Sequence, residues 1–145
     1  NLLEQLAQSG IDETEAKKIT TIVSFLTPEP KGPDLSSALW KVKKRKDFDR
    51  IINFEPSDEM PLELLEMAKQ IKIADEMANL RETVDDVKSG KDGQDREIYD
   101  HKPFTDRVAV FEERISTIAG KYPRHSFLHQ LQSDLNFLKG CLRSS

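Results

Sequence analysis

The longest helical pattern of the chain runs from Pro61 to Ser89 and carries two apolar stripes. In each stripe apolar residues recur at spacings of three and four, the period of a helix face. The first stripe is Leu64, Met67, Ile71, Ala74 and Ala78; the second is Ile73, Met77, Leu80, Val84 and Val87. Ile71 and Ile73 lie roughly 200° apart around a helix, so the stripes face nearly opposite ways. This pattern predicts a long central helix with a packing partner on each side.

Shorter patterns predict three helices before the central one. Residues 1–9 have an apolar face, and Gly10 follows where a left-handed helix cap is expected. Asp12 and Glu15 have the spacing of a capping pair for a second helix, whose apolar stripe is Ala16, Ile19, Ile22, Val23 and Leu26. Residues 27–34 contain three prolines and a glycine, so we expect a connector there.

A third helix is predicted from Leu35 to a point before Pro56, because residues that precede a proline avoid helical geometry. Its apolar positions are Leu35, Ala38, Leu39, Val42, Phe48, Ile51 and Ile52. These positions predict a helix that packs one apolar face on the core and leaves a basic middle in solvent.

Two further helices are predicted after a charged segment at residues 90–103. The first has Phe104, Val108, Phe111, Ile115 and Ile118 on one face and stops at Gly120 and Pro123; the second has Leu128, Leu131, Leu135, Leu138 and Leu142. The short link between them favours an antiparallel hairpin. We therefore predict an all-α bundle of about six helices, with the central helix packed between the N-terminal helices and this C-terminal hairpin.

The predicted domain comprises residues 1–145, with a potential internal boundary in the charged segment 90–103. The chain opens at Asn1 in the middle of an apolar repeat, which indicates a domain excised from a longer protein. Hydrophobic residues make up 37% and charged residues 33% of the chain, and no apolar run approaches the ~18 residues that span a bilayer. One cysteine, Cys141, favours a reducing compartment, so we expect the cytoplasm or the nucleus.

The formal net charge of −4 argues against a protein that coats nucleic acid, yet one segment is strongly basic. Its side chains are Trp40, Lys41, Lys43, Lys44, Arg45 and Lys46, with Arg50 one turn further on. Large apolar residues, Leu39 and Ile52, lie at its two ends. This pattern is typical of helices that enter an acidic groove or rest on anionic lipid. The alternative is a core-packed helix with a solvated basic face.

Aromatic residues also flank the leucine seam of the last predicted helix. Phe127, Phe137 and Cys141 lie beside the leucines, where they could border a groove for a partner helix. Alternatively they complete the wide core stripe that is usual in globular helices.

Candidate chemistry is sparse. His125 and His129 are four residues apart, so on one helix face they could contribute two zinc ligands, but a zinc site needs three or four protein ligands. The carboxylates of Asp92, Asp95, Glu97 and Asp100 miss the calcium-loop spacing, and no glycine-rich phosphate loop or hydrolase motif occurs. We expect no enzyme, cofactor or metal site.

The sequence leads to one functional expectation with an alternative. We expect a non-catalytic scaffold or adaptor domain that binds another protein or helical peptide through a helical groove or the basic helix face. The alternative is a peripheral adaptor that binds anionic lipid or nucleic-acid phosphates through Lys41 to Lys46. A homodimer through the second stripe of the central helix is a further expectation.

Overall fold

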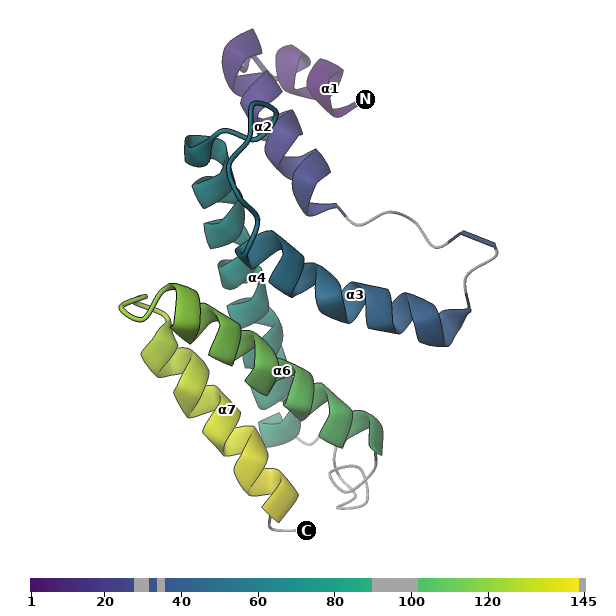
Figure 1. The fold of residues 1–145 in the computed structure, drawn as a ribbon, viewed down its shortest axis with the longest axis vertical. Coiled ribbons are helices and arrows are strands. Elements are labelled where there is room, and N and C mark those ends of the chain that lie inside the picture. The colour runs from purple at the N-terminus through teal and green to yellow at the C-terminus, as the bar shows by residue number, and fades with distance from the viewer. Residues whose placement is uncertain (28–31, 34–35, 90–101, 144–145) are drawn as a thin grey trace. The chain divides into compact units, whose positions relative to one another are not determined.

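The structure, a computed structural model, describes residues 1–27, 32–33, 36–89 and 102–143 of the chain. Within these residues all regular structure is helical, which confirms the predicted all-α bundle (Figure 1). The helices are α1 (Leu2–Gln8), α2 (Glu13–Leu26), α3 (Ser37–Ile52), α4 (Leu62–Ser89), α6 (Lys102–Lys121) and α7 (Leu128–Arg143). The helix predicted over Pro61–Ser89 is thus confirmed as α4, which is about 42 Å long at 1.5 Å per residue.

The chain forms two compact units whose boundary falls inside α4. The N-terminal unit is Asn1–Lys72 and the C-terminal unit is Ile73–Ser145. The first part of α4 therefore belongs to the unit of α1, α2 and α3, and the rest to the unit of α6 and α7. The predicted single domain and its potential boundary at 90–103 stay predictions, and residues 90–101 lie outside the described ranges, as does most of the predicted connector at 27–34.

Two short helices open the N-terminal unit. The side chain of Asn1 caps α1 by accepting a hydrogen bond from the Glu4 amide at 2.8 Å. Gly10 has a φ of 84°, so the predicted left-handed turn after the first helix is confirmed. The predicted capping pair is wrong, because the Asp12 side chain makes no cap hydrogen bond and Glu15 forms an ion pair with Lys18 at 3.6 Å.

A core cluster joins α2 to the start of α4. Its buried members are Ile22, Met60, Leu65 and Ala68, and Phe25, Leu26, Phe54 and Leu64 pack against them. The rings of Phe25 and Phe54 meet edge to face with centroids 5.0 Å apart. Val23, which the sequence placed in the apolar stripe of this helix, is 42% exposed. Phe25, which was not part of the predicted stripe, packs against the core cluster instead. The buried face of α2 is therefore displaced around the helix from the predicted face.

The first predicted stripe of the central helix is wrong for most of its members. Met67 and Ile71 are 49% and 48% exposed, and Ala74 and Ala78 are exposed as well. The buried positions of this part of α4 are Leu65, Ala68 and Lys69. The Lys69 ammonium donates a hydrogen bond to the Phe54 carbonyl at 2.9 Å, which lets a lysine occupy a core position. Because Lys69 is charged, the buried face of this part of α4 does not stand out as an apolar stripe in the sequence.

The second predicted stripe is confirmed in the C-terminal unit. Ile73, Leu80, Val84 and Val87 are buried, and Met77 is half-buried. These residues are mostly covered within one chain, and the expected homodimer through this stripe stays a prediction. Helices α6 and α7 lie side by side and antiparallel, as predicted (Figure 1). Their buried residues are Phe104, Val108, Phe111, Ile115, Ile118, Leu128, Leu131, Leu135 and Leu138.

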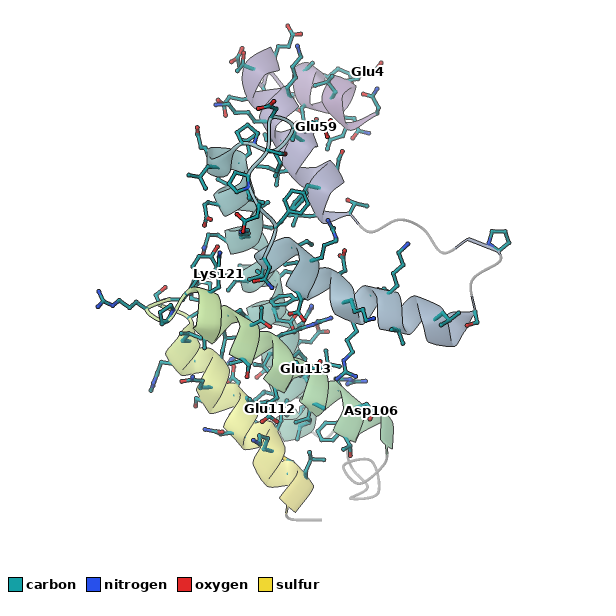
Figure 2. The ribbon with its side chains drawn as sticks, in the orientation of Figure 1. Glu4, Glu59, Asp106, Glu112, Glu113 and Lys121 are labelled. Carbon is teal, nitrogen blue, oxygen red and sulfur yellow. The ribbon has the colours of Figure 1, made fainter. Side chains whose placement is uncertain are left out.

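Ion pairs link every pair of helices in the C-terminal unit. Arg114 of α6 meets Glu76 of α4 at 2.9 Å, and Arg81 of α4 meets Asp134 of α7 at 2.7 Å. The third pair, Lys139 of α7 with Glu112 of α6, spans 3.2 Å on the surface. Glu112 and Glu113 follow one another on α6 (Figure 2). These contacts fix which helix faces meet, while the apolar core supplies most of the stability.

The turn between α6 and α7 differs from the predicted one in how α6 ends. Gly120 lies inside α6, which continues to Lys121 and stops ahead of Pro123. Proline has no backbone N–H and cannot continue the helical ladder, so Pro123 and not Gly120 supplies the stop signal. Within the described ranges, no helix combines the length and apolar character that crossing a membrane requires.

Candidate interaction surface on α3

Helix α3 is defined by a side-chain cap and a short C-terminal turn. The Ser36 hydroxyl accepts a hydrogen bond from the Leu39 amide at 3.2 Å, which satisfies one open donor of the first turn. At the other end the Asn53 amide donates to the Asp49 carbonyl at 3.0 Å. The helix therefore starts two residues after Leu35, where the sequence placed its beginning, and Leu35 lies outside the described residues.

The two faces of α3 differ sharply in exposure. Phe48, Ile51 and Ile52 are at most 1% exposed, as predicted. Leu39 and Val42 are 58% and 49% exposed, so their predicted place in the core stripe is wrong. The reason is the helical period: these two residues lie about 120° or more from Phe48. They project on the side that the core does not reach.

Exposed lysines share this outward face. Leu39, Val42, Lys43 and Lys46 fall within an arc of about 100° around the helix axis, and all four are exposed. We call these four residues the α3 surface. Lys44 and Arg45 are also exposed and lie to either side of it. The part of the predicted basic cluster from Lys43 to Lys46 is therefore exposed, together with two apolar side chains.

Arg50, predicted as part of the same surface, is exposed and contacts two other residues of the N-terminal unit. Its Nε donates to Asp47 Oδ1 at 2.8 Å, and its guanidinium lies 5.4 Å from the centroid of the Phe25 ring. A cation over an aromatic face is attractive, so Arg50 ties α3 to α2. The backbones of Trp40 and Lys41 belong to α3, but their side chains lie outside the described part, and their roles in binding stay predictions.

The aromatic residues predicted beside the leucine seam occupy separate places in the C-terminal unit. Phe127 is half-buried in the α6–α7 turn, with its ring 5.1 Å from that of His125. Phe137 is 36% exposed on α7, and the Lys88 ammonium lies 5.0 Å from its ring centroid. Phe127 therefore contacts His125, and Phe137 contacts Lys88. That the two aromatic residues border one groove for a partner helix stays a prediction.

The expected histidine pair does not form on one helix face. Helix α7 begins at Leu128, so His129 lies in its first turn and His125 lies in the preceding turn. His125 Nδ1 accepts a hydrogen bond from the Phe127 amide at 3.0 Å, which directs this nitrogen to the backbone. Across the described ranges, no group of three or more His, Cys, Asp or Glu side chains is placed to hold a metal ion. Asp92, Asp95, Glu97, Asp100 and His101 lie outside these ranges.

Cys141 is partly buried near the end of α7. Burial raises the pKa of its thiol above the ordinary value, because a low-dielectric environment disfavours the thiolate. A raised pKa lowers the thiolate fraction at neutral pH and with it the nucleophilicity of this side chain.

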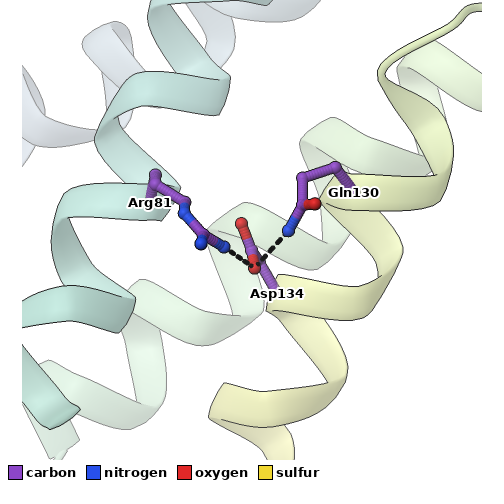
Figure 3. Close-up of polar contacts among 3 residues, drawn as sticks. All are labelled: Arg81, Gln130 and Asp134. Atoms are coloured by element: carbon purple, nitrogen blue, oxygen red, sulfur yellow. Dashed lines mark hydrogen bonds and ion pairs between the residues drawn. The ribbon is translucent and has the colours of Figure 1, made fainter.

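Sequence reasoning missed a polar network between α4 and α7 (Figure 3). Asp134 is 4% exposed, and its Oδ1 accepts hydrogen bonds from Arg81 Nη1 at 2.7 Å and from Gln130 Nε2 at 2.8 Å. Asp134 Oδ2 is buried without a hydrogen-bond partner among the described residues. Gln130 and Asp134 are four apart on one helix, and this spacing is the only signal that could have revealed the network.

Comparison of the chain with protein-family models, curated proteins and solved structures finds no match.

Proposed function

We propose that this chain is a non-catalytic interaction module, a scaffold or adaptor domain, that binds a partner polypeptide through the α3 surface. The observation that carries the proposal is the exposure of Leu39 and Val42, at 58% and 49%, on a helix whose other face is buried. Contiguous exposed apolar surface rimmed by polar residues is typical of interaction sites, and Leu39 and Val42 are neighbours on one helix face. We place the module in the cytoplasm or nucleus, and the single cysteine, Cys141, supports this placement.

The chemistry of the α3 surface defines the partner. Leu39 and Val42 supply an apolar centre, and Lys43 and Lys46 supply a charged rim. Interfaces commonly combine a desolvated centre with polar rim residues that set orientation and association rate. The partner should therefore present an apolar stripe or shallow groove bordered by Asp or Glu.

A second candidate is an anionic surface, and the joint exposure of Lys43, Lys44, Arg45 and Lys46 favours it. Basic residues near an anionic membrane contribute about 1 kcal/mol each, and salt screens this attraction. With only two apolar anchors on the α3 surface, binding of this kind would be mainly electrostatic. It should disappear at high salt, whereas an apolar contact should persist.

The test uses the chain as bait in a cell extract and compares wild type with the double variant Leu39→Ser and Val42→Ser. A matched control, Val23→Ser with Leu62→Ser, removes two other apolar side chains of the N-terminal unit that are 42% and 59% exposed. We expect a protein that wild type and control retain and the α3 variant loses. Retention should survive about 1 M salt, where the Debye length is about 3 Å.

Two results would decide against the proposal. Equal retention by the α3 variant and by wild type would remove the α3 surface from binding. Salt-sensitive binding to vesicles that contain phosphatidylserine, lost in Lys43→Glu with Lys46→Glu and unaffected by Leu39→Ser with Val42→Ser, would support the anionic-surface candidate instead. Circular dichroism of each variant should give the wild-type helix content, because every substituted side chain is exposed.

A further inference from the structure

A second exposed apolar pair lies in the same unit, on α4. Met67 and Ile71 are one turn apart and are 49% and 48% exposed. Glu63 lies one turn before Met67 on the same side and is also exposed. We call these three residues the α4 surface. Glu59 is exposed in the loop that leads into α4 (Figure 2), so the acidic character continues beyond the helix start.

The α3 and α4 surfaces are complementary. Each has two exposed apolar side chains about one helical turn apart, Leu39 and Val42 on α3 and Met67 and Ile71 on α4. The first pair is flanked by Lys43 and Lys46, and the second has Glu63 one turn before it on the same side. Opposite charges beside matched apolar residues are the arrangement that fixes register between two helices.

These two surfaces do not cover each other within the N-terminal unit, because the apolar side chains of both are about half-exposed. They also belong to the same compact unit, so every copy of the protein carries both halves of a complementary pair. A second copy therefore provides the acidic, apolar helix face that the α3 surface requires.

We propose that the chain self-associates, with the α3 surface of one copy bound to the α4 surface of a second copy. This inference rests on the proposed function, because it names the polypeptide that the α3 surface binds. Two apolar side chains from each partner make a small contact, so the association should be weak and dependent on concentration. If the pairing is reciprocal it closes a twofold dimer, and if it does not close it builds longer chains.

The first measurement is sedimentation velocity over a concentration series. The weight-average mass of the wild-type chain should rise above the monomer mass of 16.6 kDa as concentration increases. Met67→Ser with Ile71→Ser should weaken the association at least about tenfold, as should Leu39→Ser with Val42→Ser, because each removes one apolar centre. Val23→Ser with Leu62→Ser serves as the matched control and should leave it unchanged.

A charge exchange gives the more specific test. One variant carries Lys43→Glu and Lys46→Glu, so both of its surfaces are acidic. The other carries Glu59→Lys and Glu63→Lys, so both of its surfaces are basic. Each variant alone should remain monomeric, because like charges then face each other. An equimolar mixture should associate, because every contact between the two variants pairs opposite charges.

The outcomes separate this inference from the proposed function. A wild-type chain that stays at the monomer mass at every concentration overturns self-association, and so does a mixture no heavier than its components. If the Leu39→Ser and Val42→Ser variant nevertheless loses a partner from cell extract, the proposed function stands and the second copy is excluded as that partner. Circular dichroism of Glu63→Lys should report at most a slightly weakened α4, since a cation in the first turn of a helix is only mildly unfavourable.

Discussion

At the scale of single residues, the N-terminal unit and the C-terminal unit each bury a charged side chain of α4. Lys69 and Glu76 are both 2% exposed. The Lys69 ammonium donates to the Phe54 carbonyl, and the Glu76 carboxylate accepts from Arg114. Removing a charge from water is costly unless hydrogen bonds and an opposite charge compensate for it. Each contact therefore selects one packing arrangement more than it adds net stability.

The Glu76 contact yields a prediction about the C-terminal unit. Arg114→Leu removes the cation beside a buried carboxylate, and we expect it to lower the free energy of unfolding by about 3–5 kcal/mol. Changing Glu76→Leu in the same chain should recover most of this loss, because an apolar pair can replace a buried ion pair at little cost. Urea denaturation of both variants measures the difference. A double variant less stable than the single one would contradict this account.

Lys69 yields a second prediction, with a control on the same helix. Lys69→Met keeps the aliphatic volume but removes the hydrogen bond to the Phe54 carbonyl, so we expect a loss of about 1–3 kcal/mol. Lys72→Met changes a lysine of the same helix that is half-buried, not fully buried, and it should alter stability by less than about 0.5 kcal/mol. Equal losses in the two variants, measured by thermal unfolding, would show that the Lys69 contact has no special role.

At the scale of elements, one half of α4 has a buried face that was predictable from the sequence and the other half does not. Its bounds and its stripe from Ile73 to Val87 were predictable, because apolar residues there recur without interruption. The buried face of its first part was not predictable from hydrophobicity, since Lys69 occupies a core position and Met67 and Ile71 remain exposed. Spacing from Leu65 through Lys69 to Ile73 keeps the helical period, so a charged residue in step with a core stripe is the signal to look for.

The two faces of α4 can be compared directly by truncation. Leu80→Ala should cost about 2–5 kcal/mol, because Leu80 is fully buried and its removal leaves a cavity. Ile71→Ala, on the same helix at 48% exposure, should change stability by less than about 0.5 kcal/mol. Chemical denaturation at low protein concentration, where the chain is monomeric, measures both. A large decrease in the free energy of unfolding for Ile71→Ala would contradict the exposure of this residue and would support the predicted first stripe as a buried face.

The candidate site was predictable in charge but not in its apolar part. The run of cations from Lys43 to Lys46 was evident, because a local charge cluster needs no tertiary information. The exposure of Leu39 and Val42 depends on which face of α3 the core covers. The helical period separates Leu39 and Val42 from Phe48, but which of the two sides meets the core is a tertiary effect. Arg50 is exposed as well, and its contact with Phe25 on another helix could not be read from the sequence.

At the scale of the whole molecule, the two compact units share α4 without an intervening linker. The boundary between Lys72 and Ile73 lies inside a continuous helix of 28 residues. Unfolding of either unit would leave half of α4 without its packing, and short isolated helices are marginal in water. We therefore expect one cooperative unfolding transition. The fluorescence of Trp40, in the N-terminal unit, and circular dichroism of all helices should give the same midpoint, whereas two separate midpoints would contradict this expectation.

The shared helix also has a consequence for hydrogen exchange. Backbone amides in the middle of α4, from Lys69 to Glu76, are bonded within a helix whose two halves are anchored in different cores. Opening one unit alone removes the packing from one half of α4 and leaves these amides in the terminal turn of the half that is still held, where backbone hydrogen bonds are incomplete. Their exchange should therefore report the opening of either unit, so deuterium should enter the centre of α4 no more slowly than the buried turns on either side of it.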